Sequence, residues 1–144
     1  MRTATLKKLA SLEQALCDAP RRALLGSSLW KDDVPGLGGV YAIWSKKDGR
    51  PVYVGETCHL NHRCIDLGKT VNHTFRKKMT VAYEMQGCSD ENLTKKLSKD
   101  FLYSFIPVEL GRKELEEYLT VKWKTTLINR PPKRLLLRDV PYDF

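Results

Sequence analysis

The chain has 144 residues, of which 42% are hydrophobic, so it can form one domain with its own core and is not a wholly disordered segment. Lys and Arg number 25 against 17 for Asp and Glu, which gives a formal charge of +8. A compact domain with that excess of positive charge favours a polyanionic partner, and nucleic acid is the commonest one.

An amphipathic helix is predicted at 5–17. Four leucines recur there at steps of three and four residues, the spacing of one helical face: Leu6, Leu9, Leu12 and Leu16. Pro20 ends this pattern, and Gly, Pro and Ser interrupt 21–38, so that stretch is predicted to be irregular. Because the helix has its own apolar face, we expect 1–37 to form an N-terminal helical extension packed on the domain.

A β-hairpin is predicted next. The segments 39–45 (GVYAIWS) and 51–55 (PVYVG) have the composition of strands, and the turn between them places Gly49 where a positive φ is needed.

Three helices and a strand are expected after the hairpin. Thr57 caps a helix that runs to about 67, apolar residues mark a second helix between 75 and 85, and Ser89 caps a third. The segment 102–108 (LYSFIPV) predicts a third strand, and Pro107 near its end is typical of an edge or a strand terminus.

The last predicted helix runs from about 112 to 128 and stops before Pro131 and Pro132. The order of the elements predicts an α+β domain, in which helices flank a small three-stranded antiparallel sheet. Its core covers 38–130, and 131–144 forms a C-terminal basic tail.

The four cysteines contain no CxxC pair, and their spacing fits neither a zinc ribbon nor a secreted disulfide framework. We therefore expect reduced thiols and a cytoplasmic location. The N-terminal segment lacks the apolar core of a signal peptide, and no apolar run approaches membrane-spanning length, so no membrane partner is expected.

Two tyrosine motifs lie on the predicted hairpin, and polar residues follow them at fixed spacing. Gly39-Val40-Tyr41 is separated by eleven residues from Tyr53-Val54-Gly55. A small hydroxyl residue, an apolar residue and an arginine come next, at Thr57, Leu60 and Arg63. Late in the chain stand Leu115-Glu116-Glu117-Tyr118-Leu119 and then Asn129. In this order and spacing, residues from about 38 to 130 resemble the GIY-YIG nuclease family.

The resemblance implies a GIY-YIG-like fold and a divalent-metal-dependent DNA endonuclease, which hydrolyses phosphodiester bonds to 5′-phosphate and 3′-hydroxyl ends. The implied cofactor is Mg²⁺, or Mn²⁺ in its place, with Glu116 as its ligand. The implied partner is DNA, duplex or branched. The residues that match the catalytic positions of the family are Tyr41, Tyr53, Arg63, Glu116 and Asn129.

The residues themselves suit this chemistry. Side chains alternate between the faces of a strand, so Tyr41 and Tyr53 on the two arms of the hairpin can meet on one face. Arg63, about two turns into the next helix, can lean over that face. Tyrosine is a weak base at its usual pKa, but a nearby cation lowers that pKa. The Glu116 carboxylate is a hard oxygen ligand of the kind that Mg²⁺ prefers.

Two assignments stay open at this point. One turn after Arg63, where the family often has a polar or aromatic residue, this chain has Leu67, and the nearest substitute is His73. His73 is therefore a candidate for positioning water or phosphate, although it could equally be a polar residue at a helix start. Glu117 is adjacent to Glu116 and is the alternative metal ligand, but the Leu-Glu-x-x-Leu pattern favours Glu116.

Basic residues cluster in three groups. We expect phosphate contacts from Arg76, Lys77 and Lys78, and from Lys133, Arg134 and Arg138. The third group is better explained as a solvated helix face: Lys95, Lys96 and Lys99.

Three further interpretations concern a metal site, the function and the oligomeric state. The cluster of Cys58, His59, His62 and Cys64 suggests zinc, but no second pair closes a tetrahedral site. A non-catalytic nucleic-acid-binding module on the same fold is the alternative function, which the full set of matching residues disfavours. A homodimer would place two sites on two DNA strands.

Overall fold

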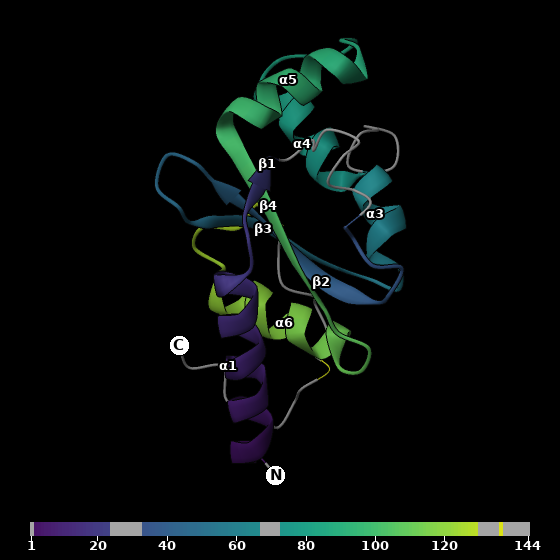
Figure 1. The fold of residues 1–144 in the computed structure, drawn as a ribbon. Coiled ribbons are helices and arrows are strands. Elements are labelled where there is room, and N and C mark those ends of the chain that lie inside the picture. Colours follow the sequence, from purple (N-terminus) through teal and green to yellow (C-terminus); the bar gives the residue numbers. More distant parts are fainter. Residues whose placement is uncertain (1, 24–32, 67–72, 130–135, 137–144) are drawn as a thin grey trace.

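The computed structural model describes residues 2–23, 33–66, 73–129 and 136. In that part of the chain the protein is α+β, with helices packed on one antiparallel sheet (Figure 1). The helices are α1 (Arg2–Asp18), α3 (Leu60–Asp66), α4 (Thr74–Ala82), α5 (Asp90–Asp100) and α6 (Arg112–Lys122). The strands are β1 (Arg22–Ala23), β2 (Gly39–Ser45), β3 (Pro51–Thr57) and β4 (Phe101–Pro107). None of these helices is long and apolar enough to cross a membrane.

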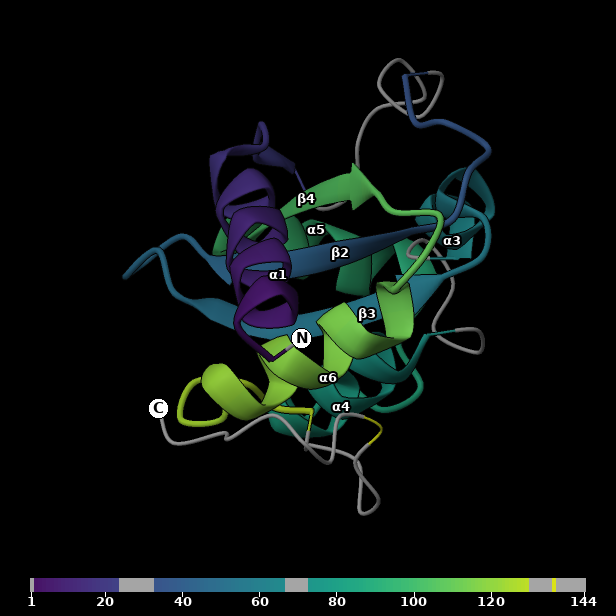
Figure 2. The same ribbon diagram turned by 90° about the horizontal axis from the view of Figure 1, so that it is seen from below.

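The sheet has the order β1-β4-β2-β3, and all its neighbours are antiparallel. Figure 2 shows the layers from below, with α1 and α6 on one face and α4 and α5 on the other. Strand β2 lies between β4 and β3, so both of its edges are paired, and its side chains divide between two cores on the two faces of the sheet. Val40, Ala42 and Trp44 face α1 and α6, whereas Tyr41 and Ile43 face α4 and α5.

The predicted hairpin is confirmed. Gly49 has a φ of 70°, and its amide donates to the Ser45 carbonyl at 2.9 Å, which closes the turn. The Ser89 cap is confirmed too, since its hydroxyl accepts from the Asn92 amide at 3.2 Å. The predicted three-stranded sheet is corrected to four strands. Strand β1 pairs with β4 over only two residues, which is too short to give a periodic signal.

Three predicted helix ends were wrong. Thr57 stays in β3, because it pairs with Gly39, and α3 starts at Leu60. Helix α4 ends at Ala82, because Glu84 takes a left-handed φ of 54°. Helix α6 ends at Lys122, six residues before the predicted end, because the chain turns back there to reach the sheet.

The returning chain covers the free edge of β3. The Ile128 amide donates to the Val52 carbonyl at 2.8 Å. The Asn129 side chain spans the next peptide groups, since its Nδ2 donates to the Val54 carbonyl at 2.8 Å and its Oδ1 accepts from the Val54 amide at 3.4 Å. These bonds satisfy edge groups that would otherwise be open to another strand.

Helix α1 is fixed to the domain by apolar contacts and by one carboxylate. Leu9 and Leu16 are buried in the same core as Leu115 of α6. Glu13 accepts from Lys122 Nζ at 2.6 Å and from Trp123 Nε1 at 3.0 Å. The predicted extension therefore contributes to the main core.

We predict that Glu13→Ala destabilises the protein by about 2 kcal/mol, because it leaves the half-buried indole N–H and the Lys122 ammonium without their acceptor. Equilibrium denaturation followed by tryptophan fluorescence measures this loss. Gln14→Ala, on the exposed side of the same helix, is the matched control and should cost less than about 0.5 kcal/mol. Equal losses in the two variants would contradict the assigned role of Glu13.

Candidate active site

Two tyrosines meet on the face of the sheet that α4 and α5 cover. Tyr41 of β2 and Tyr53 of β3 have ring centroids 6.3 Å apart and planes inclined by 26°. Both side chains are buried, at 1% and 8% exposure. The alternation of side chains along the hairpin therefore brings them together as predicted.

Gly55 lets the Tyr41 ring cross strand β3. The two residues are paired in the sheet, and a Cβ built on Gly55 would lie 2.4 Å from Tyr41 Oη and 2.5 Å from Cζ. Contacts this short are not tolerated, so the phenol can reach its position only over a residue without a side chain.

Helix α3 brings Arg63 to the Tyr41 hydroxyl. Leu60, at its first turn, is fully buried, and the Leu60 amide donates to the Leu37 carbonyl at 2.8 Å. Cys64 is buried next to Leu60, so this helix presents Arg63 toward the sheet. Arg63 Nε donates to Tyr41 Oη at 3.2 Å, which confirms the predicted proximity.

His73 reaches the same hydroxyl from the start of α4. Its side chain is completely buried, and its Nε2 lies 3.1 Å from Tyr41 Oη. Its Nδ1 accepts from the Phe75 amide at 3.1 Å, so His73 is also the N-cap of α4. Burial, helped by the positive charges of Arg63 and Arg76, lowers the pKa of His73 to about 3, so the ring is neutral at physiological pH.

The electrostatic environment opposes ionisation of both phenols. Burial raises the pKa of Tyr41 and that of Tyr53, since a phenolate loses its hydration there. The charge of Arg63 acts in the opposite direction on both groups. The Tyr53 hydroxyl also lies within hydrogen-bonding reach of Thr74 and Tyr41. Both phenols therefore keep their protons unless further positive charge is brought close.

Glu116 of α6 approaches this group at the β3 edge. Its negative charge acts on the pKa of both tyrosines, which places the carboxylate in their vicinity. Burial raises the pKa of Glu116 to about 7, and the negative charge of Glu56 adds to this rise. The hydrogen bond from the Glu56 backbone amide acts in the opposite direction and lowers the pKa. A carboxylate whose ionised form is disfavoured by burial is suited to binding a cation.

The two adjacent glutamates of α6 have different partners. Glu117 is 2% exposed, and its carboxylate accepts from the Leu136 amide. Of the two, only Glu116 acts on the pKa of the tyrosines.

Asn129 was predicted to belong to the catalytic set, but its side-chain amide is bonded to the Val54 peptide groups. Asn129 therefore holds the returning chain against the β3 edge.

The predicted phosphate contacts divide into three cases. Arg76 is fully buried, and its guanidinium donates to the Asp90 carbonyl at 2.9 Å and to Thr94 Oγ1 at 3.2 Å, so it joins α4 to α5 and is not placed to meet DNA. Lys77 and Lys78 are exposed on α4, and Lys78 Nζ donates to the Ile128 carbonyl at 3.1 Å beside β3. Lys133 and Arg134 lie outside the described residues, as does Arg138.

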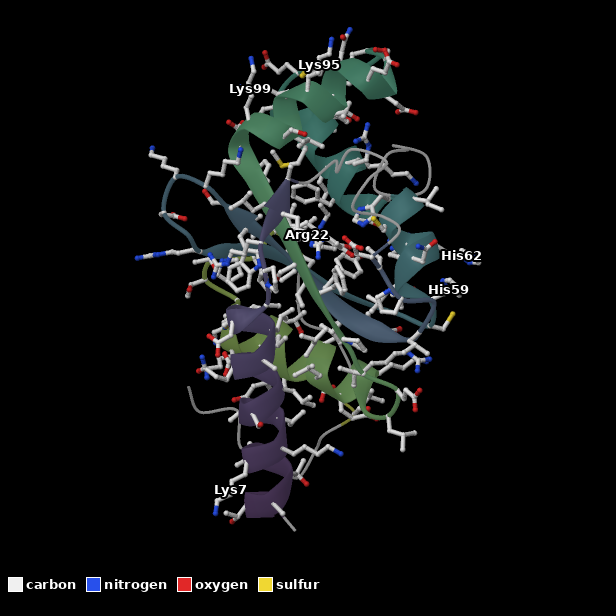
Figure 3. The ribbon with its side chains drawn as sticks, in the orientation of Figure 1. Lys7, Arg22, His59, His62, Lys95 and Lys99 are labelled. Carbon is white, nitrogen blue, oxygen red and sulfur yellow. The ribbon has the colours of Figure 1, made fainter. Side chains whose placement is uncertain are left out.

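The remaining polar clusters lie away from the tyrosines. His59 and His62 project outward from the end of β3 and from α3, whereas Lys95 and Lys99 project from α5 (Figure 3). The two histidine rings stack at 3.6 Å, and His59 Nδ1 accepts from the His62 amide. Within the described ranges, no three His, Cys, Asp or Glu side chains are grouped to hold a metal.

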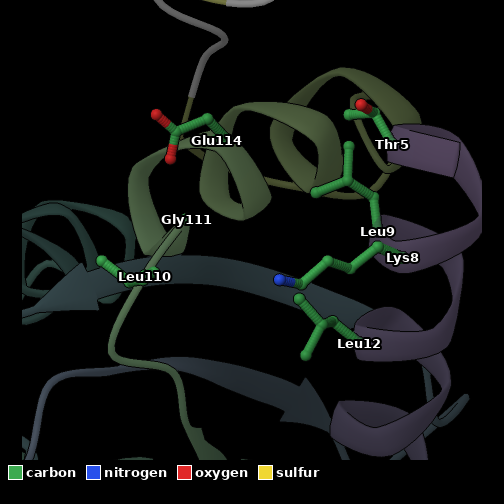
Figure 4. A pocket seen from close by; sticks show the side chains of 7 residues that line it. All are labelled: Thr5, Lys8, Leu9, Leu12, Leu110, Gly111 and Glu114. Carbon is green, nitrogen blue, oxygen red and sulfur yellow. The ribbon is translucent and has the colours of Figure 1, made fainter. Parts of the chain in front are cut away.

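A hollow lies between α1 and the start of α6, on the opposite face of the sheet (Figure 4). Leu9, Leu12 and Leu110 supply most of its apolar lining, and Lys8 and Glu114 stand at its sides. No residue of the tyrosine group lines it, so we assign it no part in the chemistry.

Sequence reasoning missed two contributors to the site. The Glu56 carboxylate accepts from Arg112 Nε at 2.9 Å. The Glu56 backbone amide, in β3, donates to Glu116. Thr74 is hydrogen-bonded to Tyr53. Neither residue belongs to a periodic pattern, and only the position of Glu56 directly after the second tyrosine motif could have drawn attention to it.

A comparison of the chain with family models, curated proteins and solved structures found no match.

We predict that Glu116→Gln in EDTA raises the melting temperature by about 3 °C at pH 8.5, or ~1 kcal/mol after allowance for solvent screening. The folded pKa of about 7 exceeds the ordinary value of 4.5, so the folded protein binds more protons than the unfolded chain between these values. Wild-type stability therefore falls as the pH rises through this window, and the difference should vanish near pH 4. Glu109→Gln, at an exposed position before α6, is the control and should have the melting temperature of the wild type at pH 8.5. A melting temperature of Glu116→Gln below the wild type at pH 8.5 would contradict the assignment.

Proposed function

We propose that this protein is a divalent-metal-dependent DNA endonuclease of the GIY-YIG type, with Mg²⁺ or Mn²⁺ as its cofactor. One observation supports the proposal above all others. Side chains from four other segments of the chain converge on the Tyr41 phenol. Arg63 Nε and His73 Nε2 lie within hydrogen-bonding distance of its oxygen. The Tyr53 ring lies beside it, and the charge of Glu116 acts on its pKa.

The donor set at the β3 edge fits a hard divalent cation. Glu116 offers carboxylate oxygens, and burial raises its pKa, so a cation bound beside it would favour its ionised form. Mg²⁺ commonly binds to one or two carboxylates and completes its shell with water and phosphate oxygens. When bound, such a cation would stabilise negative charge on the phosphate and favour ionisation of nearby phenols.

The residues of the chain would act on three parts of the reaction. The water oxygen forms a bond to phosphorus while the bond between phosphorus and the 3′-oxygen breaks, and the 3′-oxygen would take up a proton from solvent. Tyr41, in its phenolate form, would accept the proton of the attacking water. The Arg63 guanidinium would donate to non-bridging oxygens of the phosphate, where negative charge grows. Tyr53 would hydrogen-bond the water or the phosphate.

Charge on the surface supports a nucleic-acid substrate. The chain carries a formal charge of +8, and the exposed Lys77 and Lys78 of α4 lie on the side of β3 where Ile128 returns. Contacts from such lysines to phosphates would position DNA without reading its sequence. Their exposure leaves them accessible to a duplex or a branched substrate.

The first test is metal-dependent cleavage. Supercoiled plasmid, short duplex, branched DNA and RNA are each incubated with protein in Mg²⁺, in Mn²⁺ and in EDTA. We expect cleavage of DNA with either metal and none in EDTA, and products with 5′-phosphate ends that ligate directly. Glu116→Gln should be inactive, whereas Glu109→Gln should cleave as the wild type does. DNA binding without cleavage under every condition would favour the non-catalytic binding module, and preferential cleavage of RNA would change the substrate class.

The second test concerns Arg63. If its guanidinium stabilises charge that builds during cleavage, removing it should slow chemistry more than it weakens binding. We predict that Arg63→Ala lowers the single-turnover cleavage rate at least about a hundredfold, the order seen for the loss of one oxyanion donor, and that DNA affinity changes less than about tenfold. Arg63→Lys should remain impaired, because an ammonium cannot reproduce the guanidinium fork. An unchanged rate at saturating DNA, with weakened binding in gel-shift titrations, would make Arg63 a positioning residue instead.

A further inference from the structure

His73 lies next to the Tyr41 hydroxyl. Whether His73 donates or accepts in this hydrogen bond decides whether the ring can take up the proton of Tyr41. We propose that His73 is fixed in the tautomer protonated at Nε2 and donates to Tyr41, so that it positions Tyr41 and does not accept its proton. This inference deepens the proposed function and rests on it for the role of Tyr41, whereas the tautomer itself follows from the fold.

The first step is the N-cap of α4. The opening amides of a helix have no acceptor within the helix, and here the Phe75 amide donates to His73 Nδ1 at 3.1 Å. An amide is only a donor, so Nδ1 must present a lone pair to it. A neutral imidazole carries one N–H, and that hydrogen must then be on Nε2. The Nε2 atom lies 3.1 Å from Tyr41 Oη, so its N–H is directed at the phenol oxygen.

The second step is that the ring stays neutral. His73 is fully buried, at 0% exposure, and the charges of Arg63 and Arg76 both act against an imidazolium there. A doubly protonated ring would also set an Nδ1–H against the Phe75 N–H, which would break the cap. Helix α4 and the two arginines therefore fix the same tautomer.

The third step concerns the Tyr41 proton. The phenol oxygen receives one N–H from Arg63, at 3.2 Å, and one from His73. With both donors in place, the O–H of Tyr41 has to turn away from them, and the Tyr53 hydroxyl lies within its reach. His73 has no lone pair left for this proton. Two fixed donors also favour the phenolate over the phenol, so His73 would assist Tyr41 without any proton transfer of its own.

The direct test reads the tautomer by NMR. Long-range ¹H–¹⁵N spectra of the ¹⁵N-labelled protein at neutral pH distinguish protonated from unprotonated ring nitrogens. The chain has three histidines, and the spectrum of His73→Gln identifies the His73 signals by their loss. We expect a protonated Nε2 and an unprotonated Nδ1. A proton on Nδ1, or on both nitrogens, would overturn the proposal whether or not the protein cleaves DNA.

Two variants separate the functions of the two nitrogens. Asparagine places its side-chain oxygen near the position of Nδ1 and can cap α4, but it cannot reach Tyr41. Glutamine extends an amide N–H toward the position of Nε2 and does not supply the cap. We expect the Phe75 amide to stay protected from hydrogen exchange in His73→Asn and to lose protection in His73→Gln.

Cleavage should show the opposite order. Single-turnover rates should fall by at least about tenfold in His73→Asn and by less in His73→Gln, because a donor to a developing phenolate is worth about 1.5–3 kcal/mol. His62→Asn, at an exposed position of α3, is the matched control and should match the wild type. Equal losses in both variants, or a larger loss in His73→Gln, would point to proton transfer by the ring and overturn the proposal. If the wild type does not cleave DNA at all, the proposed function fails, and the NMR and exchange results still decide the tautomer.

Discussion

The passage of the Tyr41 ring over Gly55 determines where its hydroxyl meets Arg63 and His73. A Cβ at 55 would come within 2.4 Å of the phenol oxygen, so the ring crosses β3 over a residue without a side chain. Its hydroxyl then lies between α3 and the start of α4, where Arg63 Nε donates to it at 3.2 Å and His73 Nε2 lies 3.1 Å away. The tyrosine motifs are therefore a geometric requirement, in which the glycine of the second motif makes room for the tyrosine of the first.

The β3 edge has two functions that depend on each other. The segment after α6 bonds to the edge through the Ile128 amide and the Asn129 side chain, which protects it from pairing with another chain. The same return of the chain holds α6 against β3 and so brings Glu116 to the Glu56 amide and toward the phenols. Asn129 can therefore support the position of Glu116 through its bonds to the β3 edge.

Buried charge is used in two different ways in this domain. Arg76 and Glu117 are buried, and both bond to other segments. Arg76 donates to the Asp90 carbonyl and Thr94 Oγ1 of α5, and Glu117 accepts from the Leu136 amide, so they fix neighbouring segments. Arg63 and Glu116 are only partly buried, and their charges act on the two phenols. The same residue types thus differ in function according to whether their polar atoms are used up within the fold or remain directed toward the tyrosines. Arg76, one of the residues from which a phosphate contact was expected, is thus used within the fold.

The sequence alone determined the α+β class, the hairpin with its glycine turn, the Ser89 cap and the meeting of Tyr41 with Tyr53 and Arg63. These features follow from local patterns, because strand alternation, turn geometry and helix capping depend on residues close together in the chain. The tertiary structure decided what depends on distant neighbours. It added β1, which pairs over two residues, ended α6 at Lys122, buried Arg76, bonded Glu117 to the Leu136 amide and bonded Asn129 to the sheet edge. It also brought His73 to the Tyr41 hydroxyl across 32 positions of sequence. No periodicity encodes such a contact, since it exists only once α4 has packed on the sheet and the Phe75 amide has taken the other ring nitrogen.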